Sequence, residues 1–155
     1  MRLHSFRTMA AAAAALFAVS TGGAAVADTV RTASNLKVPE AVANMKAAIE
    51  ASGSRVFTVA RFDKGAASVG VVLRPTATII FGGPQIGAEA LPEHQLMALH
   101  LPLRVLAYED AAGKTWLAYS DMRDEAAASG LVADHPGVVR MREALAAAAK
   151  AGTGD

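Results

Sequence analysis

The strongest restriction on the fold comes from two strand-like segments that are separated by a very short loop. Residues 101–108 are nearly continuously apolar, residues 114–120 contain Trp116 and Tyr119, and Ala111-Ala112-Gly113 joins the two segments. A three-residue loop of this type places its glycine in the left-handed position of a bulge and makes the flanking strands antiparallel neighbours. The resulting register sets Tyr108 opposite Trp116, which is a large cross-strand contact on one face of the sheet.

Further strands are predicted on either side of an amphipathic helix. Residues 29–34, 55–62, 68–73 and 77–81 read as strands, with turns at residues 63–65 and 74–76. Pro39 suits the first turn of a helix, Gly53 suits its end, and Val42, Met45 and Ile49 recur between them at helical spacing. This spacing predicts a helix with one apolar stripe that packs against the sheet.

The second half of the chain adds shorter helical elements. Residues 85–99 are interrupted by Gly87 and Pro92, which favours two short helical turns over one long helix. Ser120 or Asp121 is expected to cap a short helix ending at Gly130, and Asp134 with Pro136 to begin a final helix. The chain is therefore predicted to be a two-layer α+β domain, with an antiparallel sheet of about five to six strands and helices packed mainly on one side.

The first 27 residues have the organisation of a signal peptide. Arg2 and Arg7 precede an Ala-rich apolar stretch, and Ala25-Val26-Ala27 offers the small residues that a signal peptidase requires. The apolar stretch is too short for the roughly 20 residues of a membrane span. We therefore expect cleavage after Ala27, no stable membrane anchor, a periplasmic or secreted protein, a single domain over residues 28–150 and a frayed tail over residues 151–155.

Charge and cysteine content exclude several classes of protein. Without residues 1–27 the chain has 13 basic and 14 acidic residues, which does not support nucleic-acid binding. The absence of cysteine excludes disulfides, thiolate zinc sites and covalently attached c-type haem. No cofactor is indicated.

Several short stretches resemble the bacterial domain-of-unknown-function 302 family in their order and spacing. They are Phe-Thr-Val-Ala-Arg-Phe-Asp at 57–63, Leu-Arg-Pro-Thr at 73–76, Ile-Phe-Gly-Gly-Pro at 80–84, Leu-Pro-Leu-Arg at 101–104, and the hairpin over 108–119. The similarity covers about residues 37–131. It implies a two-layer α+β domain with an arrangement like that of the TATA-binding protein, self-association as a homodimer, and no established activity. Family members often have Asp-His where this chain has Asp63-Lys64, so any chemistry that needs that imidazole would be missing here.

Few residues suggest chemistry by themselves. His94, His100 and His135 have no recognisable metal spacing, and we expect them to be solvated or structural. No serine lies in a nucleophile motif. Gly82-Gly83-Pro84 could cradle an anion, but Pro84 removes one donor and a tight turn is favoured.

A sheet with helices on one side leaves its other face in need of a cover, which the C-terminal helix, a second subunit or an apolar ligand could supply. We therefore expect a binding or interaction module without catalytic activity, whose partner is a second copy, a small apolar ligand or an envelope protein. The candidate ligand-binding residues are Asp63, Phe81, Pro84, Tyr108, Trp116 and Tyr119. The alternative is a small hydrolase or isomerase that uses Asp63 with Arg61 or Lys64, and it requires a concave pocket at the end of the second strand.

Overall fold

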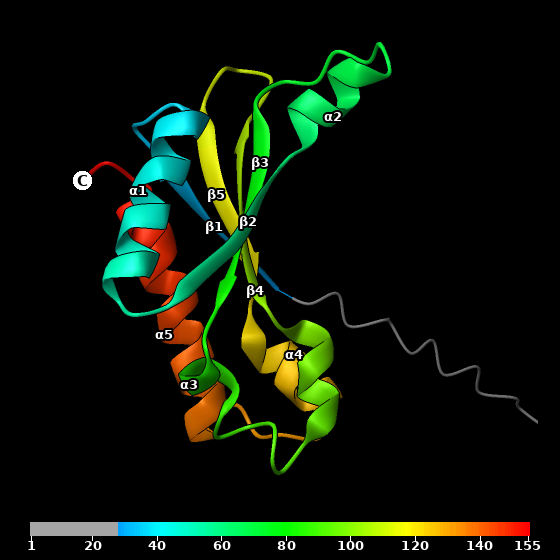
Figure 1. Cartoon of the computed structure of the whole chain (residues 1–155), viewed down its shortest axis with the longest axis vertical. Coiled ribbons are helices and arrows are strands. Elements are labelled where there is room, and N and C mark those ends of the chain that lie inside the picture. Colours follow the sequence, from blue (N-terminus) through cyan, green and yellow to red (C-terminus); the bar gives the residue numbers. More distant parts are fainter. Residues whose placement is uncertain (1–27) are drawn as a thin grey trace, which may run out of the picture.

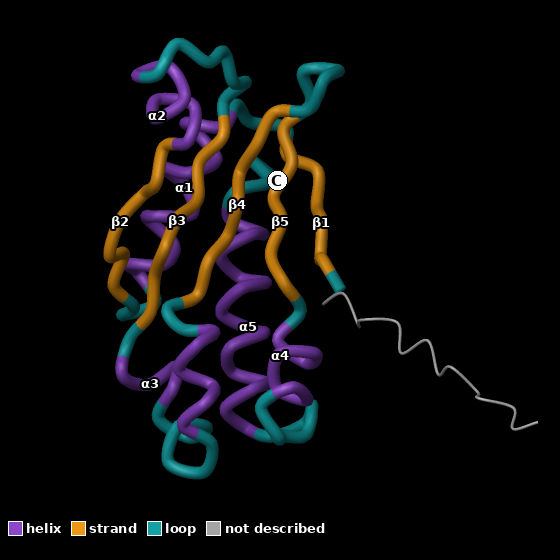
Figure 2. Tube along the Cα trace, turned by 90° about the vertical axis from the view of Figure 1, so that its right-hand side faces the viewer, coloured by secondary structure: helices purple, strands orange, loops and turns teal. Residues whose placement is uncertain are grey.

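A computed structural model describes residues 28–155. The expected signal peptide, residues 1–27, lies outside the described residues. The five strands form one open antiparallel sheet in the order β1-β5-β4-β3-β2 (Figure 2). Their bounds are β1 Thr29–Ser34, β2 Arg55–Arg61, β3 Thr76–Gly82, β4 Leu103–Glu109 and β5 Thr115–Ser120. The expected antiparallel α+β fold is confirmed, and β1 and β2 are the two edge strands of the sheet.

The helices are distributed unevenly about this sheet. Their bounds are α1 Val38–Ala51, α2 Phe62–Ser68, α3 Pro84–Gly87, α4 Met122–Ala128 and α5 Pro136–Ala151, with a 3₁₀ helix at Gln95–His100. The two long helices, α1 and α5, lie side by side on one face of the sheet (Figures 1 and 2). Helices α3 and α4 lie beyond one end of the strands, and α2 lies beyond the other end.

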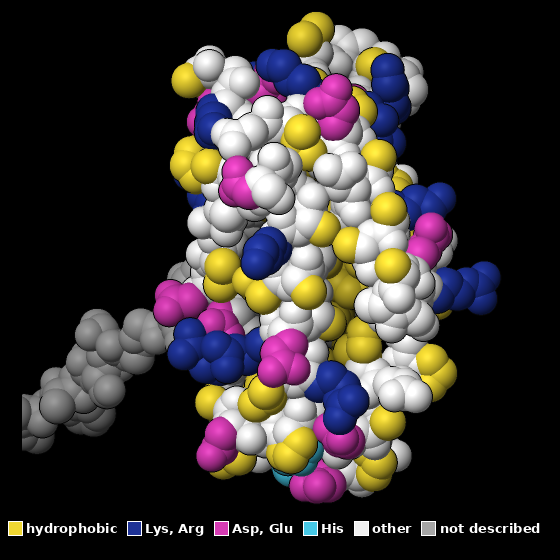
Figure 3. Space-filling view, turned by 90° about the vertical axis from the view of Figure 1, so that its left-hand side faces the viewer, with side chains coloured by type: hydrophobic (Ala, Val, Ile, Leu, Met, Phe, Trp, Pro, Cys, Tyr) yellow, Lys and Arg dark blue, Asp and Glu magenta, His cyan; other side chains and the backbone are white. Residues whose placement is uncertain are grey.

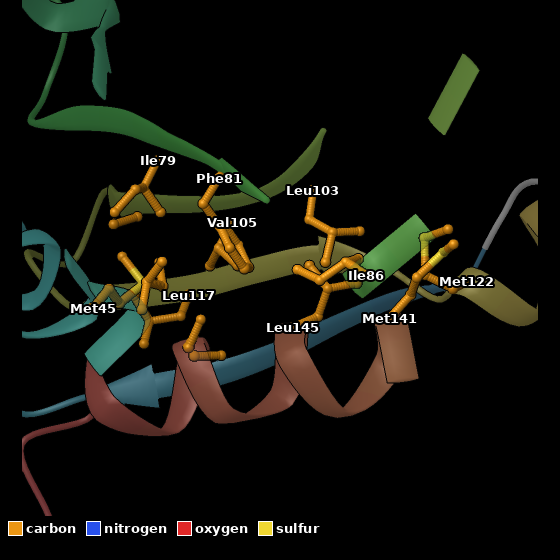
Figure 4. Packing of buried hydrophobic residues seen from close by; sticks show 14 of the residues in the cluster. Met45, Ile79, Phe81, Ile86, Leu103, Val105, Leu117, Met122, Met141 and Leu145 are labelled. Atoms are coloured by element: carbon orange, nitrogen blue, oxygen red, sulfur yellow. The ribbon is translucent and has the colours of Figure 1, made fainter. Parts of the chain in front are cut away.

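The core lies between the sheet and the two long helices. Alternation along the strands points Ile79, Phe81, Val105 and Leu117 toward the helices, and each is at most 1% exposed (Figure 4). Helix α1 contributes Val38, Ala41, Met45 and Ile49, and α5 contributes Val138, Met141 and Leu145. Because these apolar residues recur every three or four positions, each helix buries one stripe and leaves the other side in water.

The predicted hairpin has the expected register. Tyr108 pairs with Trp116 and Leu106 with Ala118, and Gly113 has the positive φ of 76° that its turn requires. The two short helical turns also occur, as α3 and the 3₁₀ helix. Asp121 caps α4 by accepting a hydrogen bond from the Arg123 amide at 3.0 Å.

Helix α5 begins at Pro136, as predicted, but its capping residue differs from the expected one. Its cap is His135, whose Nδ1 accepts a hydrogen bond from the Gly137 amide at 3.1 Å, whereas Asp134 was expected to start it.

The strand predicted over residues 68–73 is wrong. The chain forms α2 over residues 62–68, including the predicted turn at 63–65, and residues 69–73 then run exposed with no strand partner among the described residues. Val69, Val71 and Val72 favour strands, but a strand forms only where a neighbour accepts its backbone hydrogen bonds. The edge strand β2 pairs directly with β3 and leaves no place for this segment between them.

The C-terminal tail was expected to be frayed, but it is held in place. The Asn35 amide donates to the Thr153 carbonyl at 2.8 Å, and the Ser34 hydroxyl donates to the Gly152 carbonyl at 2.7 Å. Gly152 and Thr153 are buried as a result. These hydrogen bonds tie the end of α5 to the end of β1, and sequence position alone carries no sign of them.

Candidate functional site

One face of the sheet carries no helix over its strands, and we call it the open face (Figure 2). The register places side chains from neighbouring strands in rows across it, such as Ala33, Trp116, Tyr108 and Thr76. Most side chains of this face are half-buried or exposed, in contrast to the core side. The open face is the side on which the sheet is available to a ligand or partner.

An aromatic and charged cluster lies at one end of the open face, and we call it the Arg31 cluster. It consists of Arg31, Tyr108, Asp110 and Trp116. The guanidinium carbon of Arg31 is 3.7 Å from the centroid of the Trp116 ring and 5.4 Å from that of Tyr108. The Trp116 indole nitrogen donates to Asp110 Oδ2 at 2.7 Å, and an Arg31 nitrogen is 4.0 Å from the same oxygen. The arginine is thus held by a cation–π contact and a long ion pair.

Asp110 organises both this cluster and the hairpin loop. Its Oδ1 accepts hydrogen bonds from the amides of Ala112 at 2.9 Å and Lys114 at 3.0 Å. The Trp116 hydrogen bond, the Lys114 amide and the other donors hold the pKa of Asp110 below its usual value. Asp110 therefore stays ionised and acts as an acceptor here, and it is not suited to act as a base near neutral pH.

An apolar pocket lies at the other end of the sheet, and we call it the glycine-end pocket. Its volume is about 610 Å³, within the usual range of small-molecule sites. The residues that line it are Arg55, Phe57, Gly82, Gly83, Pro84, Ile86, Leu101 and Pro102. Arg55 is the only charged residue among them, so the pocket presents an apolar surface with a single cation.

Local sequence features build this pocket. The β2–β3 register shifts between Val56 and Thr58, and this irregularity accommodates Phe57, which remains 53% exposed. Gly82 lies beneath it: a Cβ atom there would be 3.4 Å from Phe57 Cε2 and 3.7 Å from Pro102 Cβ. Because glycine leaves this space free, Phe57 and Pro102 become the walls of the pocket.

A second hollow of about 520 Å³ opens on the helix-covered side of the molecule (Figure 3). It lies among the end of α1, α3 and α5, and its lining includes Ser52, Gly53, Arg140 and Glu143. Arg140 is engaged with Glu89 at 2.7 Å. Because the charge of Arg140 is already paired, we rank this hollow behind the glycine-end pocket as a candidate ligand site.

The carboxylate of Asp63 is bound by the neighbouring Arg61 and is not free to act as a catalytic group. Arg61 Nε and Nη2 donate to its two carboxylate oxygens at 3.0 and 2.7 Å. This pairing lowers the pKa of Asp63 and raises that of Arg61. Asp63 and Lys64 do line a hollow of about 410 Å³ together with six residues of the segment 67–75, but Lys64 is exposed and the charge of the carboxylate is already paired with Arg61. The arrangement gives no support to Asp63 as a general base.

The three histidines have local partners. His100 Nδ1 lies 2.8 Å from Glu125, His135 caps α5 and lies 3.4 Å from Glu93, and His94 lies under Gly130. Within residues 28–155 no group of three or more metal-ligating side chains comes together. In the same range no helix is long and apolar enough to cross a membrane.

The six candidate residues from the sequence fall in different places. Tyr108 and Trp116 meet on the open face, and Pro84 lines the glycine-end pocket. Phe81 instead belongs to the core and lines the hollow of about 520 Å³ on the helix-covered side. Tyr119 packs against the core from the same side, where burial raises its pKa. These two residues do not face the open side, because strand alternation sends them to the opposite face from Trp116.

Three further residues were not singled out from the sequence. Arg31 and Arg55 look like ordinary exposed charges in strands, and Pro102 looks like part of the strand predicted from residue 101 onward. Only the pairing of strands distant in the chain brings Arg31 to Trp116, and only the tertiary structure places Phe57 and Pro102 on either side of Gly82. For Asp110 a local signal exists, since an aspartate that opens a short loop often accepts hydrogen bonds from its amides.

Comparison with known proteins gives a match to a protein family and similarity to solved structures. The family model described as "Domain of unknown function DUF302" matches residues 30–151. The crystal structure of an uncharacterised conserved DUF302 protein from Bacillus stearothermophilus is similar with a TM-score of 0.71. The sequences are 16% identical, and the similarity covers 79% of this chain and 96% of that one.

Curated relatives match only in part. Two of them are named fluoride-specific ion channel FluC 1 of Brucella suis and fluoride-specific ion channel FluC 2 of Brucella melitensis. This chain is 38% identical to each of them over 92 residues, which is 59% of its length. The match covers 36% and 34% of those proteins, so this chain spans about a third of the length of these relatives.

Proposed function

The chain belongs to the family of domains of unknown function DUF302, and from this premise we propose that it is an exported binding module without catalytic activity. The observation that carries the proposal is the open face of the sheet. A sheet whose second face holds an apolar pocket and a half-buried aromatic cluster is suited to receive a ligand or partner.

Three carboxylates of the domain are poorly suited to general-base catalysis. The pKa values of Asp63, Asp110 and Asp121 are all lowered, because each carboxylate accepts hydrogen bonds from nearby donors. A carboxylate held ionised in this way is a weak proton acceptor at neutral pH. We therefore place the alternative hydrolase or isomerase that uses Asp63 with Arg61 or Lys64 behind the binding function.

The proposed location is the periplasm or the extracellular space. It rests on the charged, apolar and small-residue segments of residues 1–27. The partial similarity to proteins named as ion channels is consistent with a domain that works at the cell envelope. We do not infer any ion specificity for this chain from those names. N-terminal sequencing of protein recovered from a periplasmic fraction should begin at Asp28. A product that begins at Met1 and remains in the cytosol would refute the export.

We further propose that the module is a homodimer, paired through an apolar projection that we call the arm. The arm comprises α2 and the loop that follows it, residues 62–74, and it stands beyond the end of the strands (Figure 1). Its exposed apolar residues are Phe62, Val69, Val71, Val72 and Leu73. Val72 is 100% exposed, and residues 65–73 contain no charge. Such a patch on a soluble protein usually marks an interface.

A second copy suits the arm because the segment is self-complementary. Val72 is fully exposed and protrudes from the arm, and it is also one of the residues that line the hollow of about 410 Å³. The other lining residues include the small or apolar Ala67, Gly70, Leu73 and Pro75 and the charged Asp63 and Lys64. In a two-fold dimer the same patch of each copy meets its equivalent, so the protrusion of one arm can enter the hollow of the other. The burial of several valines would then supply the hydrophobic stabilisation.

Light scattering on size-exclusion fractions tests the dimer directly. The protein should have twice the chain mass, and Val72→Asp should convert it to a monomer without loss of helical circular dichroism. Val132→Asp is the matched control, because Val132 is 65% exposed but lies outside the arm. A monomeric wild-type protein would rule out self-association through the arm.

Native mass spectrometry tests the binding function as a whole. Protein exported by its own signal peptide and isolated from the periplasm should retain a small molecule or a partner chain. A retained mass that disappears in the Phe57→Ala variant would support binding at the glycine-end pocket. Protein without any retained mass, whatever the isolation conditions, would argue against a ligand-binding module.

A further inference from the structure

We propose that the glycine-end pocket takes a small molecule with a ring-sized apolar body and one anionic group, and that Arg55 meets the anion. The inference rests on the proposed binding function and names the chemical class of the ligand. It is drawn from the composition of the pocket walls, from the state of Arg55 and from the space left by Gly82.

The walls select an apolar body. Phe57 offers a half-exposed ring, while Ile86, Leu101 and Pro102 complete an almost entirely apolar surface around the pocket of about 610 Å³. An aromatic ring or branched chain placed against Phe57 would bury apolar surface on both sides. A strongly polar molecule such as a sugar would instead leave its hydroxyls without hydrogen-bond partners.

Arg55 supplies the charge selection. It is exposed, and its guanidinium carbon is 5.9 Å from the centroid of the Phe57 ring. A second arginine, Arg104, is exposed on the same face two residues beyond Pro102. Neither arginine forms a salt bridge with any residue of the described chain. No carboxylate lines the pocket. A carboxylate or sulfonate on the ligand would therefore find a charge-assisted hydrogen-bond donor, and a cationic ligand would be repelled.

Gly82 keeps the floor of the pocket open. A methyl group there would touch Phe57 and Pro102 at ordinary contact distances, and a longer side chain would extend into the space between these two residues. Gly82 lies in β3 without a positive φ, so its backbone accepts other residues. A Gly82→Leu substitution is thus expected to fill the pocket.

Two dyes with the same ring system separate the apolar and anionic parts of the proposal. 8-Anilinonaphthalene-1-sulfonate carries one anionic group, whereas N-phenyl-1-naphthylamine carries none. Each dye is titrated into the exported protein. The sulfonate should bind about fivefold more tightly than the neutral dye, because an exposed ion pair contributes at most about 1 kcal/mol. The difference should shrink at high salt, because salt screens exposed charges.

Substitutions assign each part to a residue. Arg55→Gln should reduce sulfonate affinity to that of the neutral dye and leave the neutral dye unchanged. Lys46→Gln is the matched control, since it removes the same charge from the outside of α1 and should change neither affinity. Gly82→Leu should weaken both dyes. Phe57→Ala, at an exposed position, provides the same test if the leucine variant does not fold.

The outcomes distinguish the inference from the function it rests on. Equal affinity of the two dyes, together with no effect of Arg55→Gln, would overturn the anionic selection and leave the pocket as a binding site. Dye binding that neither Gly82→Leu nor Phe57→Ala weakens would overturn the pocket itself. Absence of binding by both dyes would overturn both the inference and the proposed small-molecule binding.

Discussion

The guanidinium carbon of Arg31 lies 3.7 Å from the centroid of the Trp116 ring, although the two residues come from β1 and β5 at distant points of the chain. The same indole donates to Asp110 at 2.7 Å, so a cation and an anion both contact one ring. Trp116 is the only tryptophan of the protein. Its fluorescence therefore reports on this end of the open face without interference from other sites.

Removal of the cation should change this fluorescence more than it changes stability. An exposed cation–π contact contributes about 0.5–1 kcal/mol, so Arg31→Gln should lower the free energy of unfolding by no more than this amount. The Trp116 emission maximum should shift, because the face of the ring that Arg31 contacts becomes accessible to water. Emission spectra and urea denaturation measure the two effects. Arg104→Gln serves as the control, and a variant with unchanged emission would show that Arg31 does not cover the ring in solution.

Acid should break the Asp110 contact at a pH below the normal aspartate range. The pKa of Asp110 is lower in the folded state than in the unfolded state. The ionised carboxylate therefore stabilises the fold fully above its unfolded pKa, about 4, and this stabilisation is lost as the pH falls through its folded pKa. Trp116 emission should therefore titrate with a midpoint below about pH 4. Asp110→Asn should remove this step. A midpoint above the unfolded value would contradict the hydrogen-bond pattern.

Asp121 should be the carboxylate whose loss costs the most stability. It is 5% exposed, caps α4 through the Arg123 amide, and accepts from Arg123 Nη2 at 2.6 Å, while Arg142 of α5 lies 3.4 Å away. Asp121→Ala removes the cap and both ion pairs, and should cost about 2 kcal/mol. Asp121→Asn can still cap the helix and should cost about half as much.

Chemical denaturation of the two Asp121 variants provides the measurement. Equal losses for alanine and asparagine would mean that the ion pairs, and not the helix cap, carry the effect. The pKa of Asp121 is lowered as well, mainly by Arg123, so its contribution should also disappear in acid, as the pH falls below about 4.

The C-terminal tail should behave as part of the core. A Cβ at Gly152 would lie 2.8 Å from Leu117 Cδ1 and 2.9 Å from Met45 Cγ, and both of those side chains are fully buried. Gly152→Ala should therefore cost about 1–3 kcal/mol through overpacking. Gly65→Ala is the contrast: the site in α2 has nothing within 4 Å, and alanine should stabilise it by up to about 1 kcal/mol. A tolerated Gly152→Ala in thermal unfolding would mean that the tail moves aside.

Local sequence signals predicted those parts of the fold that depend on neighbouring residues. The hairpin register follows from the loop at residues 111–113, and the strand at residues 29–34 has the bounds that its sequence indicated. For the same reason the Tyr108–Trp116 pair of the open face was predictable. The contact between Arg31 and Trp116 was not predictable, because β1 and β5 are neighbours in the sheet but far apart in the sequence, and nothing near Arg31 in the sequence refers to residue 116.

The errors arose where local preference and packing disagree. The valines at residues 69–72 favour a strand, yet no neighbouring strand is free to pair with them. Phe81 and Tyr119 illustrate a related difficulty: an aromatic residue in a strand does not reveal which face it takes, and both lie on the helix-covered side of the sheet.

The amino-acid sequence by itself determined the α+β class, the antiparallel hairpin, the amphipathic helices and the family, because each depends on residues that are close together or on a pattern along the chain. Only the tertiary structure decided which face of the sheet stays open, where the glycine-end pocket lies and which charges meet Trp116. Those features arise from strand order and from the side on which α1 and α5 pack. Both are settled by burial of the whole core and not by any single segment.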